Sequence, residues 1–193
     1  MKMLRYLVRL DNNDGFSGRD AVTVLNKGRK LADNLGATIK VVRVSSASIE
    51  LDVFVPDDEV LQRLLPVLSS SIGKLESFRR TDVELPPASK NELIEHAKSL
   101  FNEQRFWECH EALEQIWRRE SGQEKEILQG IILTAAALVH YQRGRDQVSL
   151  SVFKRAYEKL RKHSGLYFGI DINYMKSSMK KMLDTGAIEV FKI

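Results

Sequence analysis

The chain has 193 residues, of which 43% are hydrophobic and 29% charged, with 4 prolines, 11 glycines and 1 cysteine. These fractions are typical of folded globular proteins and exclude a collagen-like repeat, a disulfide scaffold and a disordered chain. No apolar run reaches the roughly 18 residues of a membrane-spanning helix, so we expect no membrane partner. The single cysteine, Cys109, has no partner for an internal disulfide, which predicts a reducing, cytoplasmic location.

Basic and acidic residues are unevenly distributed along the chain. The net charge of +4 is too small to indicate nucleic acid by itself. Residues 91–142, however, contain 9 acidic and 5 basic side chains, whereas residues 143–193 contain 11 basic and 5 acidic ones. The simplest interpretation is that these two regions face each other in the fold. The alternative is that the basic region binds RNA or an anionic lipid surface.

The first 86 residues have the pattern strand-helix-strand-strand-helix-strand. Strand-like alternation and helical spacing of apolar residues distinguish the elements. We expect strands at 4–10, 38–44, 49–55 and 74–83, and helices at 21–35 and 57–72. Pro66 should kink or shorten the second helix. The order of elements predicts a ferredoxin-like α/β sandwich over residues 1–86, a fold that serves many functions and therefore indicates none.

Two functions of such domains can be compared with the residues. RNA-recognition sheets stack bases on aromatic side chains of their first and third strands. Here Phe54 is the one aromatic expected on that face of the third strand, with Glu50 and Asp52 beside it, which disfavours RNA binding by the sheet. The polar turn Asp11–Gly18 suits a small effector, although ordinary turns have the same composition.

A proline-bearing joint, Leu85–Ser89, precedes a second predicted domain, residues 87–193, which we expect to be an all-α bundle of helical hairpins. Ser89 and Glu92 form a capping box at its first helix. The expected elements are helices at 89–101, 105–118, 126–142, 150–160 and 172–182, a turn over 120–125 and a strand-like end at 188–193. The helix at 126–142 is apolar nearly all round, as in a bundle centre. Two hairpins about 40 residues apart indicate either a tetratricopeptide-like pair with a partner-binding groove or an ordinary bundle.

The helix at 105–118 carries the residues best suited to chemistry. At 100° per residue, His110 shares a stripe with Phe106 and Leu113, so we expect its imidazole on the apolar face. Glu114 lies on the flank of this stripe one turn later, and Glu111 lies further round. The pattern therefore predicts a polar cluster on a face otherwise built for the core.

An antiparallel hairpin of this helix with 126–142 adds polar residues from the second helix. Its register pairs Glu114 with Gln129, His110 with Leu133, and Glu103 with His140. Gly130, beside Gln129, is expected to let the two helices approach closely.

The favoured hypothesis is a non-catalytic interaction or ligand-binding module without a cofactor. Its buried network of His110, Glu114 and Gln129 would fix the register of the hairpin. Ligand contacts would come from Glu103, Trp107, Gln129 and His140. Because Trp107 lies off the core stripe, we expect it to pack on another domain or on another subunit. The partner would be an unknown protein or a second copy of the chain.

The alternative is a metal-dependent hydrolase. His110 and Glu114, four residues apart on a helix, can both reach one divalent metal ion, with Glu103 or His140 as a third ligand. Glu111 would act as the base, so His110, Glu111 and Glu114 are the candidate catalytic residues. The pattern has one imidazole where the His-Glu-x-x-His motif has two, and the sequence leaves the choice between enzyme and binding module open.

RNA binding through the basic C-terminal helices is the third hypothesis. It rests on charge alone. The residues are Lys154, Arg155, Lys159, Arg161, Lys162, Lys176, Lys180 and Lys181.

The run Leu100–Arg118, followed by Leu128–Ile132 and Ala135–His140, resembles the small helical family catalogued as domain of unknown function 309. The resemblance covers about 60 residues, from Leu100 to roughly Tyr157, and implies an all-helical fold there. It brings no known activity, and residues 1–90 resemble nothing comparable. The positions that match the family's signature are His110, Glu111, Glu114, Trp117, Gln129 and Gly130.

Overall fold

The computed structural model describes residues 3–81 and 89–193. The chain forms two compact units: an N-terminal unit, Met1–Pro86 with Gln142–Gly144, and a helical unit, Pro87–Tyr141 with Arg145–Ile193. Most of the expected joint Leu85–Ser89 lies outside the described residues. No helix in the described part of the chain is long and apolar enough to cross a membrane.

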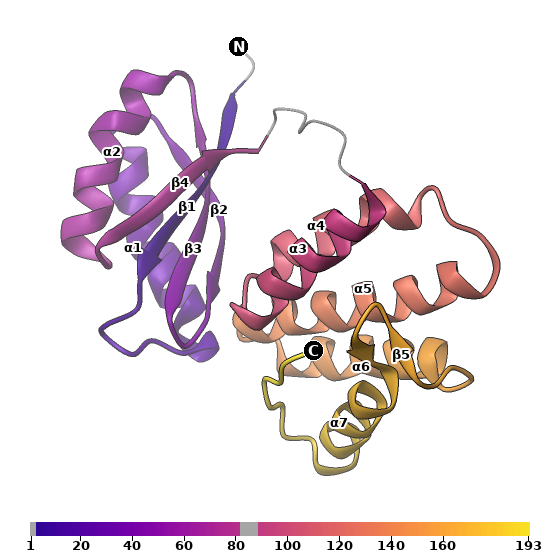
Figure 1. Cartoon of the computed structure of the whole chain (residues 1–193). Coiled ribbons are helices and arrows are strands. Elements are labelled where there is room, and N and C mark those ends of the chain that lie inside the picture. The colour runs from indigo at the N-terminus through magenta and orange to yellow at the C-terminus, as the bar shows by residue number, and fades with distance from the viewer. Residues whose placement is uncertain (1–2, 82–88) are drawn as a thin grey trace. The chain divides into compact units, whose positions relative to one another are not determined.

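The N-terminal unit contains a four-stranded sheet in which every neighbouring pair is antiparallel (Figure 1). The strands are β1 (Leu4–Asp11), β2 (Thr38–Val44), β3 (Ser48–Val55) and β4 (Leu75–Arg80), in the spatial order β2-β3-β1-β4. Helices α1 (Ala21–Asp33) and α2 (Asp58–Ser71) pack on one face, and a 3-10 turn (Gly18–Asp20) precedes α1. The chain is therefore a mixed α+β protein, as the periodicity predicted. The last residues of the expected fourth strand, 82 and 83, lie outside the described part.

Pro66 does not shorten the second helix, because α2 continues to Ser71; a kink at Pro66, the other expected effect, stays a prediction. A proline inside a helix frees the carbonyl one turn earlier, here that of Gln62. Both Pro66 and Gln62 are exposed, so water can satisfy the carbonyl and the helix tolerates the ring.

Alternation along the strands separates an apolar face from a charged one. Tyr6, Val8 and Leu10 of β1 belong to the core under the two helices. On the other face Glu50 of β3 lies between Arg9 of β1 and Arg43 of β2, its register partners on the two neighbouring strands. The Nε atom of Arg43 is 3.0 Å from Oε2 of Glu50, and Nη1 of Arg9 is 3.8 Å from Oε1. The charges of this sheet face are thus paired with one another.

The helical unit contains five helices and a short hairpin in its described residues. The helices are α3 (Lys90–Asn102), α4 (Phe106–Trp117), α5 (Gly122–Gln142), α6 (Asp146–Leu160) and α7 (Ile172–Thr185), and the hairpin joins β5 (Leu166–Tyr167) to β6 (Ile170–Asp171). The capping box is confirmed: Ser89 accepts from the backbone N–H of Glu92, whose carboxylate accepts from that of Ser89. α5 is central, since Ser149 of α6 donates to its Ala137 carbonyl and Thr134 contacts Met179 of α7.

Two expectations for this unit are wrong. The turn at 120–125 is shorter than expected, because α5 begins at Gly122, where a positive φ of 59° suits glycine. Residues 188–193 form no strand. Instead the Phe191 ring packs against Phe101 with ring centroids 5.6 Å apart, and the backbone N–H of Ile193 donates to Oδ1 of Asn102 at 2.9 Å.

Candidate functional site

The first candidate site is a cluster on α4. Nδ1 of His110 lies 3.4 Å from Oε1 of Glu111, and Nε2 lies 3.7 Å from Oε1 of Glu114. One ligand atom from each of the three residues fits within 4.8 Å of the others. Helical spacing contributes to this arrangement, since Glu114 comes four residues after His110 and three after Glu111. The structure therefore brings together the three candidate catalytic residues of the sequence analysis.

The apolar stripe predicted His110 on the buried face of α4, but the structure places it at the edge of that face. Its side chain is 25% exposed, and that of Glu114 is 32% exposed. The buried stripe of α4 is centred near Cys109 and Ile116, which places His110 at its edge. On the opposite edge Glu108 is buried and receives two hydrogen bonds from the guanidinium of Arg105, at 2.8 and 3.0 Å.

Glu103 and His140 do not complete the cluster. The group of close ligand atoms in the described residues consists of His110, Glu111 and Glu114 alone. The carboxylate of Glu103 instead accepts from the hydroxyl of Ser99 at 2.8 Å and from the guanidinium of Arg105 at 3.2 Å. Any ion held by the α4 cluster would therefore have open coordination positions, filled by water or by a ligand.

Cys109 is not a reactive thiol. Its side chain is fully buried on α4, and burial raises its pKa to about 12. A thiol that stays protonated at neutral pH is a poor nucleophile and a poor metal ligand. Cys109 is therefore part of the core rather than of the site.

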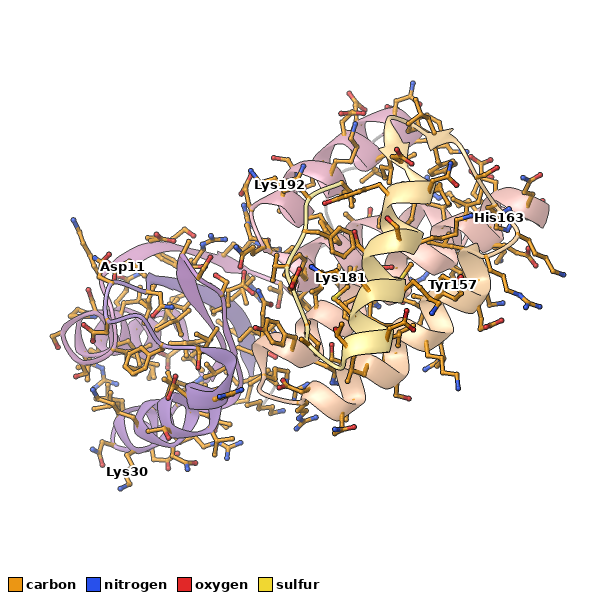
Figure 2. All side chains as sticks on the ribbon, turned by 90° about the horizontal axis from the view of Figure 1, so that it is seen from below. Asp11, Lys30, Tyr157, His163, Lys181 and Lys192 are labelled. Atoms are coloured by element: carbon orange, nitrogen blue, oxygen red, sulfur yellow. The ribbon has the colours of Figure 1, made fainter. Side chains whose placement is uncertain are left out.

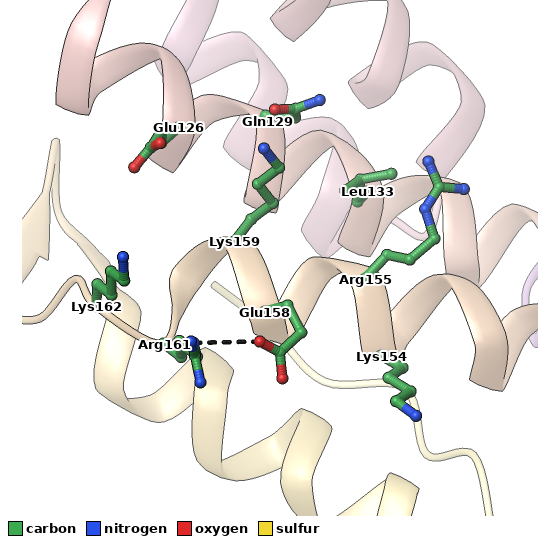
Figure 3. A pocket seen from close by; sticks show the side chains of 9 residues that line it. All are labelled: Glu126, Gln129, Leu133, Lys154, Arg155, Glu158, Lys159, Arg161 and Lys162. Carbon is green, nitrogen blue, oxygen red and sulfur yellow. Dashed lines mark ion pairs between the residues drawn. The ribbon is translucent and has the colours of Figure 1, made fainter.

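The second candidate site is a pocket of about 480 Å³ between α5 and α6 (Figure 3). Five of the nine side chains that line it are cationic and two are anionic. The lining residues are Glu126, Gln129, Leu133, Lys154, Arg155, Glu158, Lys159, Arg161 and Lys162. Gln129 and Leu133 thus face α6. In the described residues no hydrogen bond joins Gln129 to His110 or Glu114, so the expected three-residue network does not form.

A glycine allows α5 and α6 to approach closely beside this pocket. A Cβ atom at Gly130 would lie 2.4 Å from Cγ of Leu160, a fully buried residue of α6. The close approach expected at Gly130 therefore exists, but its partner is α6 rather than α4. The backbone of α5 and the side chain of Leu160 hold the two helices together at this point.

Four cations of the pocket are left without a carboxylate partner. Arg161 pairs with Glu158 at 3.1 Å, and Glu126 lies 3.3 Å from Nε2 of the buried His163. Among the residues that the structure describes, the remaining four pocket cations form no ion pair or hydrogen bond. These are Lys154, Arg155, Lys159 and Lys162.

The three lysines of α7, unlike these four pocket cations, have partners. Lys180 pairs with Asp184, and Lys181, labelled in Figure 2, pairs with Glu189 at 2.7 Å. The ammonium group of Lys176 donates to the carbonyl of His163. Of the eight cations that the sequence grouped as one basic surface, four on and just after α6 thus have no partner among the described residues, whereas Arg161 and the three lysines of α7 have partners.

Trp107 and His140 are the other expected ligand contacts. Both side chains are half-buried, and neither lines the α5–α6 pocket. Sequence reasoning identified the pocket's cations but not the pocket itself. The signal that could have found it is the matched spacing of 126, 129 and 133 with 155, 159 and 162 across the turn between the two helices.

Fold and sites together define a helical-hairpin protein with a small α/β unit and a basic pocket. Residues 94–152 match the family described as Domain of unknown function (DUF309), and the chain belongs to this family. It is 28% identical over 98 residues to an uncharacterized protein of Aquifex aeolicus (strain VF5), a match that spans 50% of this chain and 29% of that protein. It is also similar to a conserved hypothetical protein of Thermus thermophilus with a crystal structure, at 31% identity over 47% of this chain and 94% of the other, with a TM-score of 0.42. Neither relative has an assigned activity.

Proposed function

We propose that the helical unit is a binding module for a compact, phosphate-bearing anion, and that the α5–α6 pocket is its site. The observation that carries the proposal is a set of four cations around one pocket for which the described residues, 3–81 and 89–193, provide no carboxylate partner. Lysine and arginine are the usual partners of phosphate oxygens, with lysine as a point charge and arginine as a planar fork. An anion in the pocket would supply the partner that the protein itself does not.

The position of these cations favours a compact ligand over an extended nucleic acid. Lys154 and Lys162 are eight residues apart, which corresponds to about 12 Å along a helix axis. This length accommodates two or three phosphate groups. The lysines of α7, which would have to extend the track for RNA, already have partners.

Calorimetric titration with inorganic tripolyphosphate tests the proposal. We expect binding that weakens as salt rises from 50 to 200 mM, since phosphate contacts release counterions. The double variant Lys159→Gln/Lys162→Gln should lose at least about tenfold in affinity, because each charge-assisted contact contributes about 1 kcal/mol or more. The control Lys192→Gln removes a charge that lies outside the pocket lining and has no partner among the described residues, and it should bind as the wild type does. No binding, or equal loss in both variants, would refute the proposed site.

A second candidate function is divalent metal binding by the α4 cluster, supported by the three ligand atoms within 4.8 Å. Two ligands of one zinc ion lie roughly 3.4 Å apart, given metal–ligand distances near 2.1 Å, which is close to the His110–Glu111 separation. One ion takes a single nitrogen of His110, so a carboxylate must change rotamer to join it. Elemental analysis after dialysis against zinc should give close to one ion per chain for the wild type and none for His110→Ala. Equal metal content in both proteins would refute the site.

We also propose that the N-terminal unit is a ferredoxin-like domain and the helical unit an independent one, working in the cytoplasm. The order of elements and the strand order β2-β3-β1-β4 support the first assignment. Separate cores support the second, and a single, buried cysteine is in keeping with the third.

A further inference from the structure

The two ends of the α5–α6 pocket differ in chemistry. α5 and α6 run antiparallel across the turn at residues 143–145, so residues equally far from the turn lie opposite each other. This places Glu126 opposite Lys162 and Gln129 opposite Lys159. Nearest the turn, Leu133 lies opposite Arg155. Figure 3 shows Lys159 extending toward Gln129, and Arg155 reaching past Leu133. One end of the pocket therefore offers ammonium groups, and the other offers an aliphatic surface beside a guanidinium.

We infer that this pocket binds a nucleoside polyphosphate, an inference that rests on the proposed anion-binding function. The phosphates lie at Lys159 and Lys162, where the ammonium groups have no other partner. The base lies on Leu133, with the planar guanidinium of Arg155 against its face. Arginine stacks on bases and aliphatic side chains pack on them, whereas a bare phosphate uses neither property.

Gln129 gives this arrangement a means of reading the base edge. Its side-chain amide lines the pocket between the two ends and makes no hydrogen bond among the described residues. An amide offers both donors and an acceptor, which matches the mixed donor and acceptor pattern of a base edge better than the acceptor-only surface of phosphate.

The dimensions of the pocket agree with such a ligand. Small-molecule sites have volumes of about 300–1,000 Å³, and this pocket has about 480 Å³. From Arg155 to its last residue, Leu160, α6 advances about 7.5 Å. Lys162 lies two residues further on, so these cations span a length comparable to that of an extended mononucleotide. A second nucleotide would extend beyond the cations of α6.

The test compares ATP with inorganic tripolyphosphate, each titrated into the full chain without divalent cations and at the same salt concentration. We expect ATP to bind about tenfold more tightly, since base stacking typically contributes about that factor or more. The variants Gln129→Ala and Leu133→Ala should weaken ATP about five- to tenfold and leave tripolyphosphate unchanged. Thermal melts confirm that each variant folds, and Gln129→Ala keeps the test valid if the loss of Leu133 packing unfolds the chain.

The outcomes separate this inference from the function on which it rests. Equal affinity for ATP and tripolyphosphate, unaffected by either variant, would overturn the nucleoside assignment and leave the anion site standing. Binding of neither ligand would overturn both. A single-stranded RNA of ten nucleotides that binds much more tightly than ATP, with a steeper salt dependence, would overturn the assignment in favour of an extended polyanion.

Discussion

The charged face of the N-terminal sheet and the cationic pocket of the helical unit contain similar charged side chains, but they differ in whether the cations have carboxylate partners. On the sheet, three arginines pair with carboxylates of a neighbouring strand: Arg5 binds Asp52 at 2.8 Å, and Glu50 lies between Arg9 and Arg43. Lys159 of α6 and Lys162, just beyond its end, have no such partner in the part of the chain that the structure describes. The number of charges is therefore a poor guide to a binding site, and the number left without an internal partner is a better one.

The largest effect should come from removing a shared partner on the sheet. Glu50→Ala removes the carboxylate that the buried Arg43 binds at 3.0 Å, and breaking a buried pair in this way costs about 3–5 kcal/mol of unfolding free energy. Urea denaturation monitored by circular dichroism measures the loss. The matched control is Glu76→Ala, which removes an exposed partner of Arg9 and should cost at most about 1 kcal/mol. Similar losses in the two variants would show that the charged sheet face does not act as a paired unit.

A smaller effect is expected where α5 meets α6. Gly130→Ala places a Cβ atom 2.4 Å from Cγ of Leu160, and Leu160 is fully buried. Overpacking of this kind typically costs about 1–3 kcal/mol, which thermal melting detects as a lower midpoint. Because the helices must separate, tripolyphosphate binding should weaken as well. A Gly130→Ala protein with unchanged stability and affinity would contradict the close approach.

The smallest effect on stability is expected when the unpaired lysines of the pocket are replaced. Lys159→Gln/Lys162→Gln breaks no internal ion pair, so its unfolding free energy should stay within about 0.5 kcal/mol of the wild type. The same double variant should lose tripolyphosphate binding. Urea titrations of both proteins under identical conditions provide the measurement. Destabilisation of 2 kcal/mol or so, on the scale of a lost buried partner, would mean that these lysines serve the fold.

The reaction rate of the Cys109 thiol tests whether this residue belongs to the core or to an accessible site. Because burial raises its pKa to about 12, folded protein should react with Ellman's reagent far more slowly at pH 8 than protein in 6 M guanidinium chloride. The raised pKa also predicts how stability depends on pH. Above pH 9 the thiol ionises in the unfolded chain but not in the folded one, so the free energy of unfolding falls as the pH rises. Rapid reaction of the folded protein would place Cys109 at an accessible site.

Most helices and strands could be predicted because their apolar residues repeat with a clear period. The β5–β6 hairpin could not, since strands of two residues carry no period. The tail at 188–193 alternates like a strand but lacks a strand to pair with among the described residues, and its apolar side chains pack on helices instead.

The candidate sites were harder to predict, for two physical reasons. α5 is apolar nearly all round, so the sequence does not say which neighbour each face meets, and Gln129 was assigned to α4 when it faces α6. On α4 the buried stripe is defined by six residues, and a shift of its centre moved His110 from the core to the rim. The positions of His110, Glu111 and Glu114 relative to one another were predictable, because a single helix fixes them.

The contact between Gly130 and Leu160 also has consequences for the rate of binding. With backbone and a fully buried leucine holding the helices beside the pocket, the cavity exists before the ligand arrives, and only exposed side chains at its rim need to become ordered. Association at such a preformed, positively charged site should be fast and accelerated by low salt. Differences in affinity among anions should then appear mainly in how slowly each one leaves.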